Sequence, residues 1–118
     1  MYKDQRLKKS RDFNTVIRNG SSWANQTLVL ICNFSGLIHG RVGFSVSKRV
    51  GNAVTRNKIK RRLREIVRQE GVPTGWDIVF IARKKSSIAN YGTLCHSVKS
   101  LFNQAKLTSQ KSCKETNV

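Results

Sequence analysis

Residues 41–67 read RVGFSVSKRVGNAVTRNKIKRRLREIV, and their pattern changes partway along. Val42, Phe44 and Val46 alternate with small or polar residues over 41–47, which predicts a β-strand with one wet face. From residue 53 onward the apolar residues instead recur every three or four positions, which predicts an amphipathic helix. The stretch therefore predicts a strand that leads directly into a helix.

The ends of this helix carry recognisable signals. Asn52 is a good N-cap residue, and Gly71 followed by Pro73 is typical of a helix end, so the helix is expected over 53–70. On a helical projection four apolar residues share an arc of about 100°. This predicted buried stripe consists of Ile59, Leu63, Ile66 and Val67.

The opposite arc is strongly cationic. We expect it to carry Asn57, Lys60, Arg61, Arg64 and Arg68, with Arg56 at its border. Like charges at i, i+4 destabilise a helix by about 0.2–0.5 kcal/mol per pair, and cations in the first turn oppose the helix dipole. The series Arg56, Lys60, Arg64 and Arg68, called here the cationic ladder, is interrupted only by Glu65. A bound polyanion would convert these repulsions into attractions.

The rest of the chain predicts a small α+β domain. Residues 10–20 are expected to form a short helix with Ser10 as N-cap and Gly20 after its end. The apolar segment 26–34 is expected to be a strand that pairs antiparallel with 41–47 through a turn. Trp23 suggests one further short strand.

The C-terminal part supplies one more strand and one more helix. Segment 76–83 is apolar at both odd and even positions, which predicts a central strand covered on both faces, parallel to 41–47 in a βαβ unit. Residues 90–106 are expected to form a closing helix on the sheet. Its apolar stripe is Tyr91, Leu94, Val98, Leu101, Phe102 and Ala105. The tail over 108–118 has nothing to bury and is expected to be disordered.

Composition narrows the class of protein. The 118 residues predict one domain over 1–118, and the net charge of +17 predicts a polyanionic partner. No segment is long and apolar enough for a membrane span or signal peptide, so we expect a cytoplasmic protein without a membrane partner. Cys32, Cys95 and Cys113 are expected to be ordinary reduced thiols, because they are odd in number and lack metal-site spacing.

Nucleic acid is the polyanion that fits best. A membrane-surface helix would need its apolar face exposed, whereas this stripe is needed to cover the sheet. Arg56, Asn57 and Arg61 add forked donors and an amide that suit phosphates and base edges.

The sequence predicts no protein active site. Metal-dependent phosphodiester hydrolysis needs converging carboxylates, and the six acidic residues are scattered along the chain. His39 and His96 lie apart from them and are expected in a turn and on a helix. No small-molecule substrate is expected.

The stretch 41–67 resembles the signature of the bacterial ribonuclease P protein component, with a Gly-Asn-Ala-Val element followed by an Arg-Asn core and a Lys-Arg pair. The similarity extends to RLKKSRDFNTVIRNG at 6–20 and DIVFIARKK at 77–85, and covers roughly residues 6–105. It implies a two-layer α/β sandwich of order αβββαβα. The basic helix would link two parallel strands of a small mixed sheet by a left-handed crossover, an exception to the usual rule.

The resemblance also implies a function. The family's protein is a subunit of a ribonucleoprotein whose catalytic RNA removes the 5′ leader of precursor tRNA. The protein raises the affinity for substrate and metal, Mg²⁺ belongs with the RNA subunit, and no cofactor is bound by the protein alone.

The resemblance also implies which residues of this sequence form the family's binding site, position by position. The residues expected against the RNA subunit are Lys48, Arg49, Asn52, Arg56, Asn57, Lys58, Lys60, Arg61, Arg64 and Arg68. Lys58 replaces the usual arginine, which keeps the charge but loses the bidentate fork. Phe13 matches an aromatic in the cleft that binds the single-stranded leader, although with Val16 and Ile17 it could equally be core. Ile17 and Ile31 stand where the family often has aromatics, so the leader-base preference stays open.

Two other classes remain as alternatives. A ribosomal or other structural RNA-binding protein fits the size and charge, but not the 41–67 signature. A stand-alone nuclease fits poorly because the chain lacks a carboxylate cluster.

Overall fold

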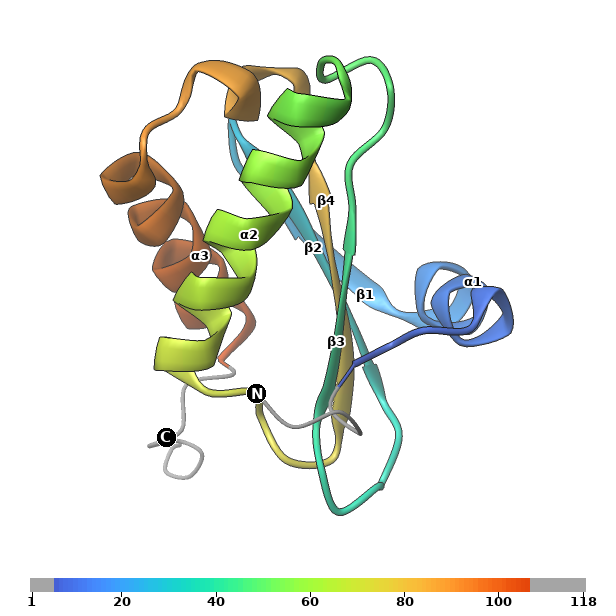
Figure 1. Cartoon of the computed structure of the whole chain (residues 1–118). Coiled ribbons are helices and arrows are strands. Elements are labelled where there is room, and N and C mark those ends of the chain that lie inside the picture. The colour runs from blue at the N-terminus through green and yellow to red at the C-terminus, as the bar shows by residue number, and fades with distance from the viewer. Residues whose placement is uncertain (1–5, 107–118) are drawn as a thin grey trace.

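The structure is a computed structural model, and it describes residues 6–106. Along the chain the elements are α1 (Ser10–Asn19), β1 (Ser21–Ala24), β2 (Leu28–Phe34), β3 (Arg41–Ser45), α2 (Ala53–Glu70), β4 (Trp76–Ala82), the 3₁₀ helix η2 (Lys84–Ile88) and α3 (Tyr91–Ala105) (Figure 1). This is the predicted α+β order, with η2 added. The predicted tail over 108–118 and Cys113 lie outside the described residues.

The four strands form one mixed sheet in the order β1-β2-β4-β3. β2 is antiparallel to both β1 and β4, whereas β3 is parallel to β4. The prediction that 26–34 and 41–47 pair directly is therefore wrong, because β4 lies between them. Ile78, Val79 and Phe80 of β4 are fully buried on both faces, and only the middle of the sheet provides that burial. The predicted central position of this strand is confirmed.

The βαβ unit formed by β3, α2 and β4 has the expected hand. In Figure 1 both strands run up the page, β3 lies in front of β4, and α2 lies to their left. Seen from the side of α2, the chain moves from β3 leftward to β4. The crossover is therefore left-handed, against the usual preference.

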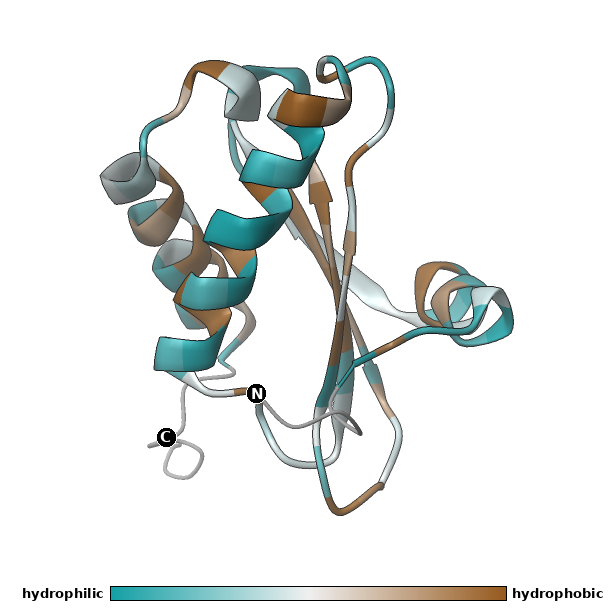
Figure 2. Ribbon diagram, in the orientation of Figure 1, coloured by the Kyte–Doolittle hydropathy of each residue, from teal (hydrophilic) through white to brown (hydrophobic). Residues whose placement is uncertain are grey.

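The main core lies between the sheet and the pair α2 and α3. Phe80 of β4 is fully buried there and contacts the rings of Phe44 and Phe102 at 6.2 and 5.7 Å between centroids. Figure 2 shows the hydrophobic sides of both helices turned to the sheet. A smaller cluster, formed by Leu7, Val16, Ile31 and Val79, lies under α1 on the opposite face. The sheet is thus covered fully on one face and partly on the other.

Both ends of α2 are where the sequence predicted them. The Asn52 side chain accepts a hydrogen bond from the Thr55 N–H at 2.9 Å, which caps the first turn. Gly71 follows the helix with φ of 89°, a conformation that favours glycine. The buried residues of α2 are the four of the predicted stripe.

The prediction for α1 was wrong at its start. Ser10 is the first helical residue, and Lys9 occupies the N-cap position without a side-chain cap. Gly20 does follow the helix, but its φ of −81° is open to any residue. Glycine is needed there for close packing, because a Cβ would lie 2.6 Å from the Val16 carbonyl oxygen and 2.7 Å from that of Cys32.

The remaining elements agree largely with the sequence. Trp23 lies in β1 and packs against the main core, as predicted. In α3 the residues Leu94, Val98, Leu101 and Phe102 are buried, whereas Tyr91, at the first position of the helix, is 38% exposed.

Candidate nucleic-acid interface

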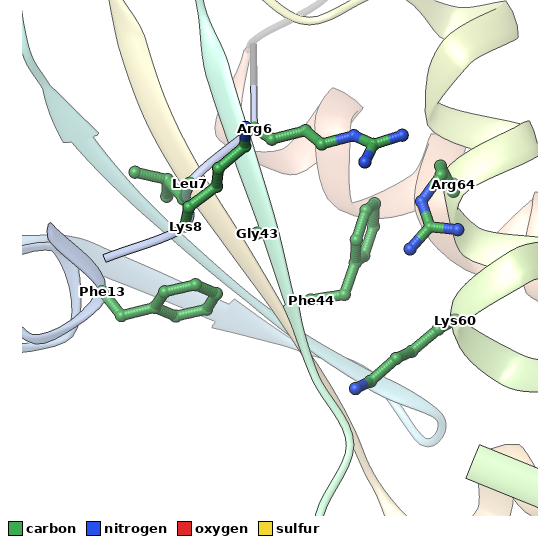
Figure 3. A pocket seen from close by; sticks show the side chains of 8 residues that line it. All are labelled: Arg6, Leu7, Lys8, Phe13, Gly43, Phe44, Lys60 and Arg64. Carbon is green, nitrogen blue, oxygen red and sulfur yellow. The ribbon is translucent and has the colours of Figure 1, made fainter. Parts of the chain in front are cut away.

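The outer edge of β3 forms the floor of a groove. β3 is the last strand of the sheet, and the N-terminal segment covers only its beginning, where the Leu7 N–H donates to the Val42 carbonyl at 2.9 Å. The hollow beside it has a volume of about 400 Å³. We call it the β3-edge groove; it is lined by Arg6, Leu7, Lys8, Phe13, Gly43, Phe44, Lys60 and Arg64 (Figure 3).

Phe13 forms one wall of this groove. Figure 3 shows its ring on one side of β3, with Lys60 and Arg64 on the other. The ring lies directly on Gly43, where a Cβ would come within 2.4 Å of the Phe13 Cζ atom. Phe13 is half-buried and packs against the small cluster under α1. Phe13 therefore contacts the core and also lines the groove, and its contact with the leader stays a prediction.

The two isoleucines at family aromatic positions differ from each other. Ile17, on α1, is 46% exposed, whereas Ile31, on β2, is 7% exposed and belongs to the small cluster. Only Ile17 offers substantial surface to a ligand.

Two residues of the cationic ladder, Lys60 and Arg64, form the opposite wall of the groove. Arg56, Lys60 and Arg64 are half-buried and only Arg68 is exposed, so the ladder flanks the buried stripe instead of facing straight into solvent. The prediction of a fully opposite arc is corrected in this respect. Long stems of Lys and Arg cover apolar surface while their charged ends stay near water. Figure 2 shows the hydrophilic residues along the length of α2.

A second hollow lies beside the first at the later turns of α2. It measures about 330 Å³ and is lined by Arg6, Arg61, Arg64, Glu65 and Arg68. Glu65 forms an ion pair with Arg68, with 2.6 Å between Oε2 and Nη2. This hydrogen bond lowers the pKa of the Glu65 carboxyl and raises the pKa of Arg68. Among residues 6–106, Arg68 is thus the one ladder residue with a carboxylate partner.

The other cations of the interface have no carboxylate partner in the part of the chain that the structure describes. Within residues 6–106 the carboxylates of Asp12, Glu65, Glu70 and Asp77 form ion pairs only with Arg41, Arg68 and Lys99. No ion pair in this part of the chain involves Lys48, Arg49, Arg56, Lys58, Lys60, Arg61 or Arg64. In addition, the Nε of Arg56 is buried without a hydrogen-bond partner. The surface is therefore suited to external acceptors.

The remaining predicted site residues lie around the start of α2. Lys48 and Arg49 are exposed in the loop between β3 and α2, and Asn57, Lys58 and Arg61 are exposed on the helix. The carboxamide oxygen of Asn52 is occupied by the helix cap. The structure thus brings ten of the eleven predicted residues onto α2 and its leading loop, and places Phe13 across β3 from them.

Sequence reasoning missed a partly buried polar network that includes Asp12, the residue before Phe13. Arg41, at the start of β3, donates from Nε and Nη2 to the two Asp77 carboxylate oxygens at 2.8 and 2.7 Å. Its Nη1 lies 3.5 Å from Asp12 on α1. The hydrogen bond with Asp77 is the largest cause that raises the pKa of Arg41, and the charges of Asp77 and Asp12 raise it further. A charged residue inside the apolar segment 76–83 was the available signal, because a buried carboxylate needs a partner.

One cation of the basic segment has a structural role. The Arg62 Nη1 donates to the Ala89 carbonyl at 3.2 Å and joins α2 to the segment after η2. Arg62 lies on the side of α2 away from the β3-edge groove.

The described residues offer neither a metal site nor a membrane-spanning helix. Within 6–106 no group of three or more His, Cys, Asp or Glu residues could hold a metal ion. None of the described helices combines the length and apolar character needed to cross a bilayer.

Comparison with known proteins identifies close relatives of this chain. The model of the family described as Ribonuclease P matches residues 1–106. A ribonuclease P protein component from Clostridium kluyveri is 42% identical over 106 residues, which cover 86% of this chain and 95% of the relative. One from Clostridioides difficile is 40% identical over 105 residues, with 86% and 92% covered.

Solved structures agree with these sequence relatives. The Staphylococcus aureus RNase P protein aligns with a TM-score of 0.81 at 36% identity, over 89% of this chain and 98% of the other. The RNase P protein from Thermotoga maritima aligns with a TM-score of 0.77 at 34% identity, over 84% and 96%.

Proposed function

The chain belongs to the ribonuclease P protein family, and on this premise we propose that it is the protein subunit that binds both the catalytic RNA and the 5′ leader of precursor tRNA. The relatives' name implies one component of an endoribonuclease that processes tRNA. In the proposal the RNA subunit cleaves the leader, and the protein increases the affinity of the complex for substrate and metal.

The cations of α2 and its leading loop, most of which form no ion pair with another described residue, support binding to the RNA subunit. Each phosphate neutralised by Lys or Arg releases condensed counterions, which favours association and makes it salt-dependent. Forked guanidinium groups at Arg56, Arg61 and Arg64 can hold phosphates bidentately. This cationic surface, where among residues 6–106 only Arg68 has a carboxylate partner, is the observation on which the proposal mainly depends.

The β3-edge groove supports binding of the single-stranded leader. Its walls combine the aromatic ring of Phe13 with the cations Lys60 and Arg64. Single strands bind to proteins by this combination, in which bases stack on aromatics and the backbone follows positive charge. We therefore assign the leader to this groove and the RNA subunit to α2 and the loop before it.

The chemistry in this proposal needs no protein catalyst. Mg²⁺ is assigned to the RNA subunit, where it would supply Lewis-acid activation and charge neutralisation. The protein's cations would replace part of the diffuse counterions that two RNA molecules need to approach each other. We expect the complex to act in the cytoplasm, where precursor tRNA is made.

Reconstitution tests the function. The purified chain is added to a bacterial ribonuclease P RNA, and precursor cleavage is measured while Mg²⁺ is lowered. We expect cleavage at low Mg²⁺ only when both components are present. Replacing Lys60 and Arg64 together by Gln should abolish this benefit, whereas Lys99→Gln, which removes one positive charge on α3 outside the groove, should preserve it. Cleavage by the chain alone would indicate a nuclease, and sedimentation with a ribosomal subunit without help to the RNA would indicate a ribosomal protein.

The leader assignment has its own test. Phe13→Ala should weaken binding of precursor tRNA by the holoenzyme and leave mature tRNA binding unchanged, because only the precursor has a base to stack on the ring. Equal losses for both substrates would mean that Phe13 serves only the core.

A further inference from the structure

Arg41 joins α1 to the sheet through one guanidinium group. Two of its nitrogens, Nε and Nη2, are fixed by the buried carboxylate of Asp77 on β4. The third, Nη1, points to Asp12 on α1, and the ion pair measures 3.5 Å. Because the guanidinium plane is rigid, the bidentate contact with Asp77 also fixes the position of Nη1.

The other contacts between α1 and the sheet are apolar. Val16 of α1 packs on Ile31 and Val79 in the small cluster. Among residues 6–106, Asp12 is the only side chain of the helix α1 with a hydrogen bond or ion pair to a strand. Apolar burial has little directional preference, whereas an arginine–carboxylate pair prefers one geometry. The ion pair can therefore fix the rotation of α1 where the apolar contacts leave it adjustable.

The rotation of α1 about its axis determines the position of the Phe13 ring. Phe13 follows Asp12 directly in the helix, and its ring lies on Gly43, two residues after Arg41 on β3. Asp12, Arg41, Gly43 and Phe13 thus form a closed loop of contacts across two elements. A turn of the helix about its axis would move the ring off Gly43 and change the width of the β3-edge groove.

We propose that Asp12 is a positioning residue for the leader: acting through Arg41, it holds the Phe13 ring at the wall of the β3-edge groove. This inference rests on the proposed function, because it takes the leader as the ligand of that groove. Asp12 itself need not touch RNA, and a carboxylate next to phosphates would repel them.

A double-mutant cycle on the reconstituted holoenzyme tests the proposal. Asp12→Asn, Phe13→Ala and the double variant are compared for binding of precursor and mature tRNA. The matched control is Glu70→Gln, which removes the carboxylate of another ion pair, with Lys99 at 3.6 Å, and changes the net charge equally. Thermal melting of each variant confirms that it is folded at the assay temperature.

We expect Asp12→Asn to weaken precursor binding about three- to tenfold. This loss is smaller than the one expected when a base can no longer stack on the ring at all. Mature tRNA binding should stay unchanged, and Asp12→Glu should restore most of the loss because it keeps the carboxylate. In the Phe13→Ala background, Asp12→Asn should change precursor binding less than about twofold, because coupled residues are not additive. Glu70→Gln should have no leader-specific effect.

The outcomes distinguish a failure of this inference from a failure of the proposed leader binding. If Phe13→Ala itself spares precursor binding, the leader assignment is wrong. If Phe13→Ala weakens precursor binding but Asp12→Asn behaves like Glu70→Gln, or adds its full effect in the double variant, Asp12 does not act through the ring and the inference is overturned. A loss shared by mature tRNA would overturn it as well.

Discussion

Replacing Lys60 by Gln should stabilise the free protein while weakening its complex with RNA. Lys60 has Arg56 and Arg64 at i−4 and i+4, and none of the three has a carboxylate partner among the described residues. Two like-charge pairs of about 0.2–0.5 kcal/mol each predict that the free energy of unfolding rises by about 0.4–1 kcal/mol. Gln and Lys have similar helix propensities, so the substitution changes little besides the charge.

Urea denaturation followed by circular dichroism measures this effect, because urea leaves the ionic strength unchanged. The gain should be present at about 0.01 M salt, where the Debye length is about 30 Å, and disappear at 1 M, where it is about 3 Å. Lys99→Gln is the matched control. Lys99 pairs with Glu70, so its loss should leave stability unchanged or lower it by up to about 1 kcal/mol. A Lys60→Gln protein that is less stable at low salt, or whose gain persists at 1 M, would refute the self-repulsion of the ladder.

Three further predictions concern single residues. In a plot of log affinity for the RNA subunit against log salt, Arg61→Ala should make the negative slope less steep by about one unit. An unchanged slope would mean that Arg61 contacts no phosphate. Gly43→Ala should displace the Phe13 ring, which a Cβ would approach to 2.4 Å, and should lower stability in urea by about 1–3 kcal/mol; a neutral effect would show that the ring moves freely. Burial raises the pKa of the Cys32 thiol to about 12. Because the thiolate is the reactive form, iodoacetamide should spare Cys32 in the folded protein at pH 8 and label it in denaturant, as mass spectrometry can check. Labelling of Cys32 at equal rates in both states would contradict this.

Local signals predicted the basic helix accurately. Asn52 and Gly71 fixed its two ends, and the spacing of Ile59, Leu63, Ile66 and Val67 fixed the buried side. These features depend on neighbours within one or two turns, so one sequence suffices to find them. The central position of β4 was also predictable from local sequence, because a strand that is apolar on both faces must be buried on both.

Features that depend on distant partners could not be found in this way. The pattern of 26–34 and 41–47 is compatible with direct pairing, and nothing local shows that β4 enters between them. Similarly, the place of Asp77 inside an apolar strand can signal a buried charge, but it does not identify the partner, which lies 36 residues earlier at Arg41. The degree of exposure of Arg56 and Lys60 was also misjudged, because a helical projection does not show that the edge of β3 lies beside them.

The position of β4 between β2 and β3 sets the order in which this protein can form during synthesis. Until residues 76–82 have left the ribosome, β2 can pair only with β1, and β3 has no strand to join. A lone two-stranded hairpin is at best marginally stable in water. The positively charged segment therefore emerges before the sheet is complete, and the apolar stripe of α2 has no finished sheet to cover until the last strand arrives.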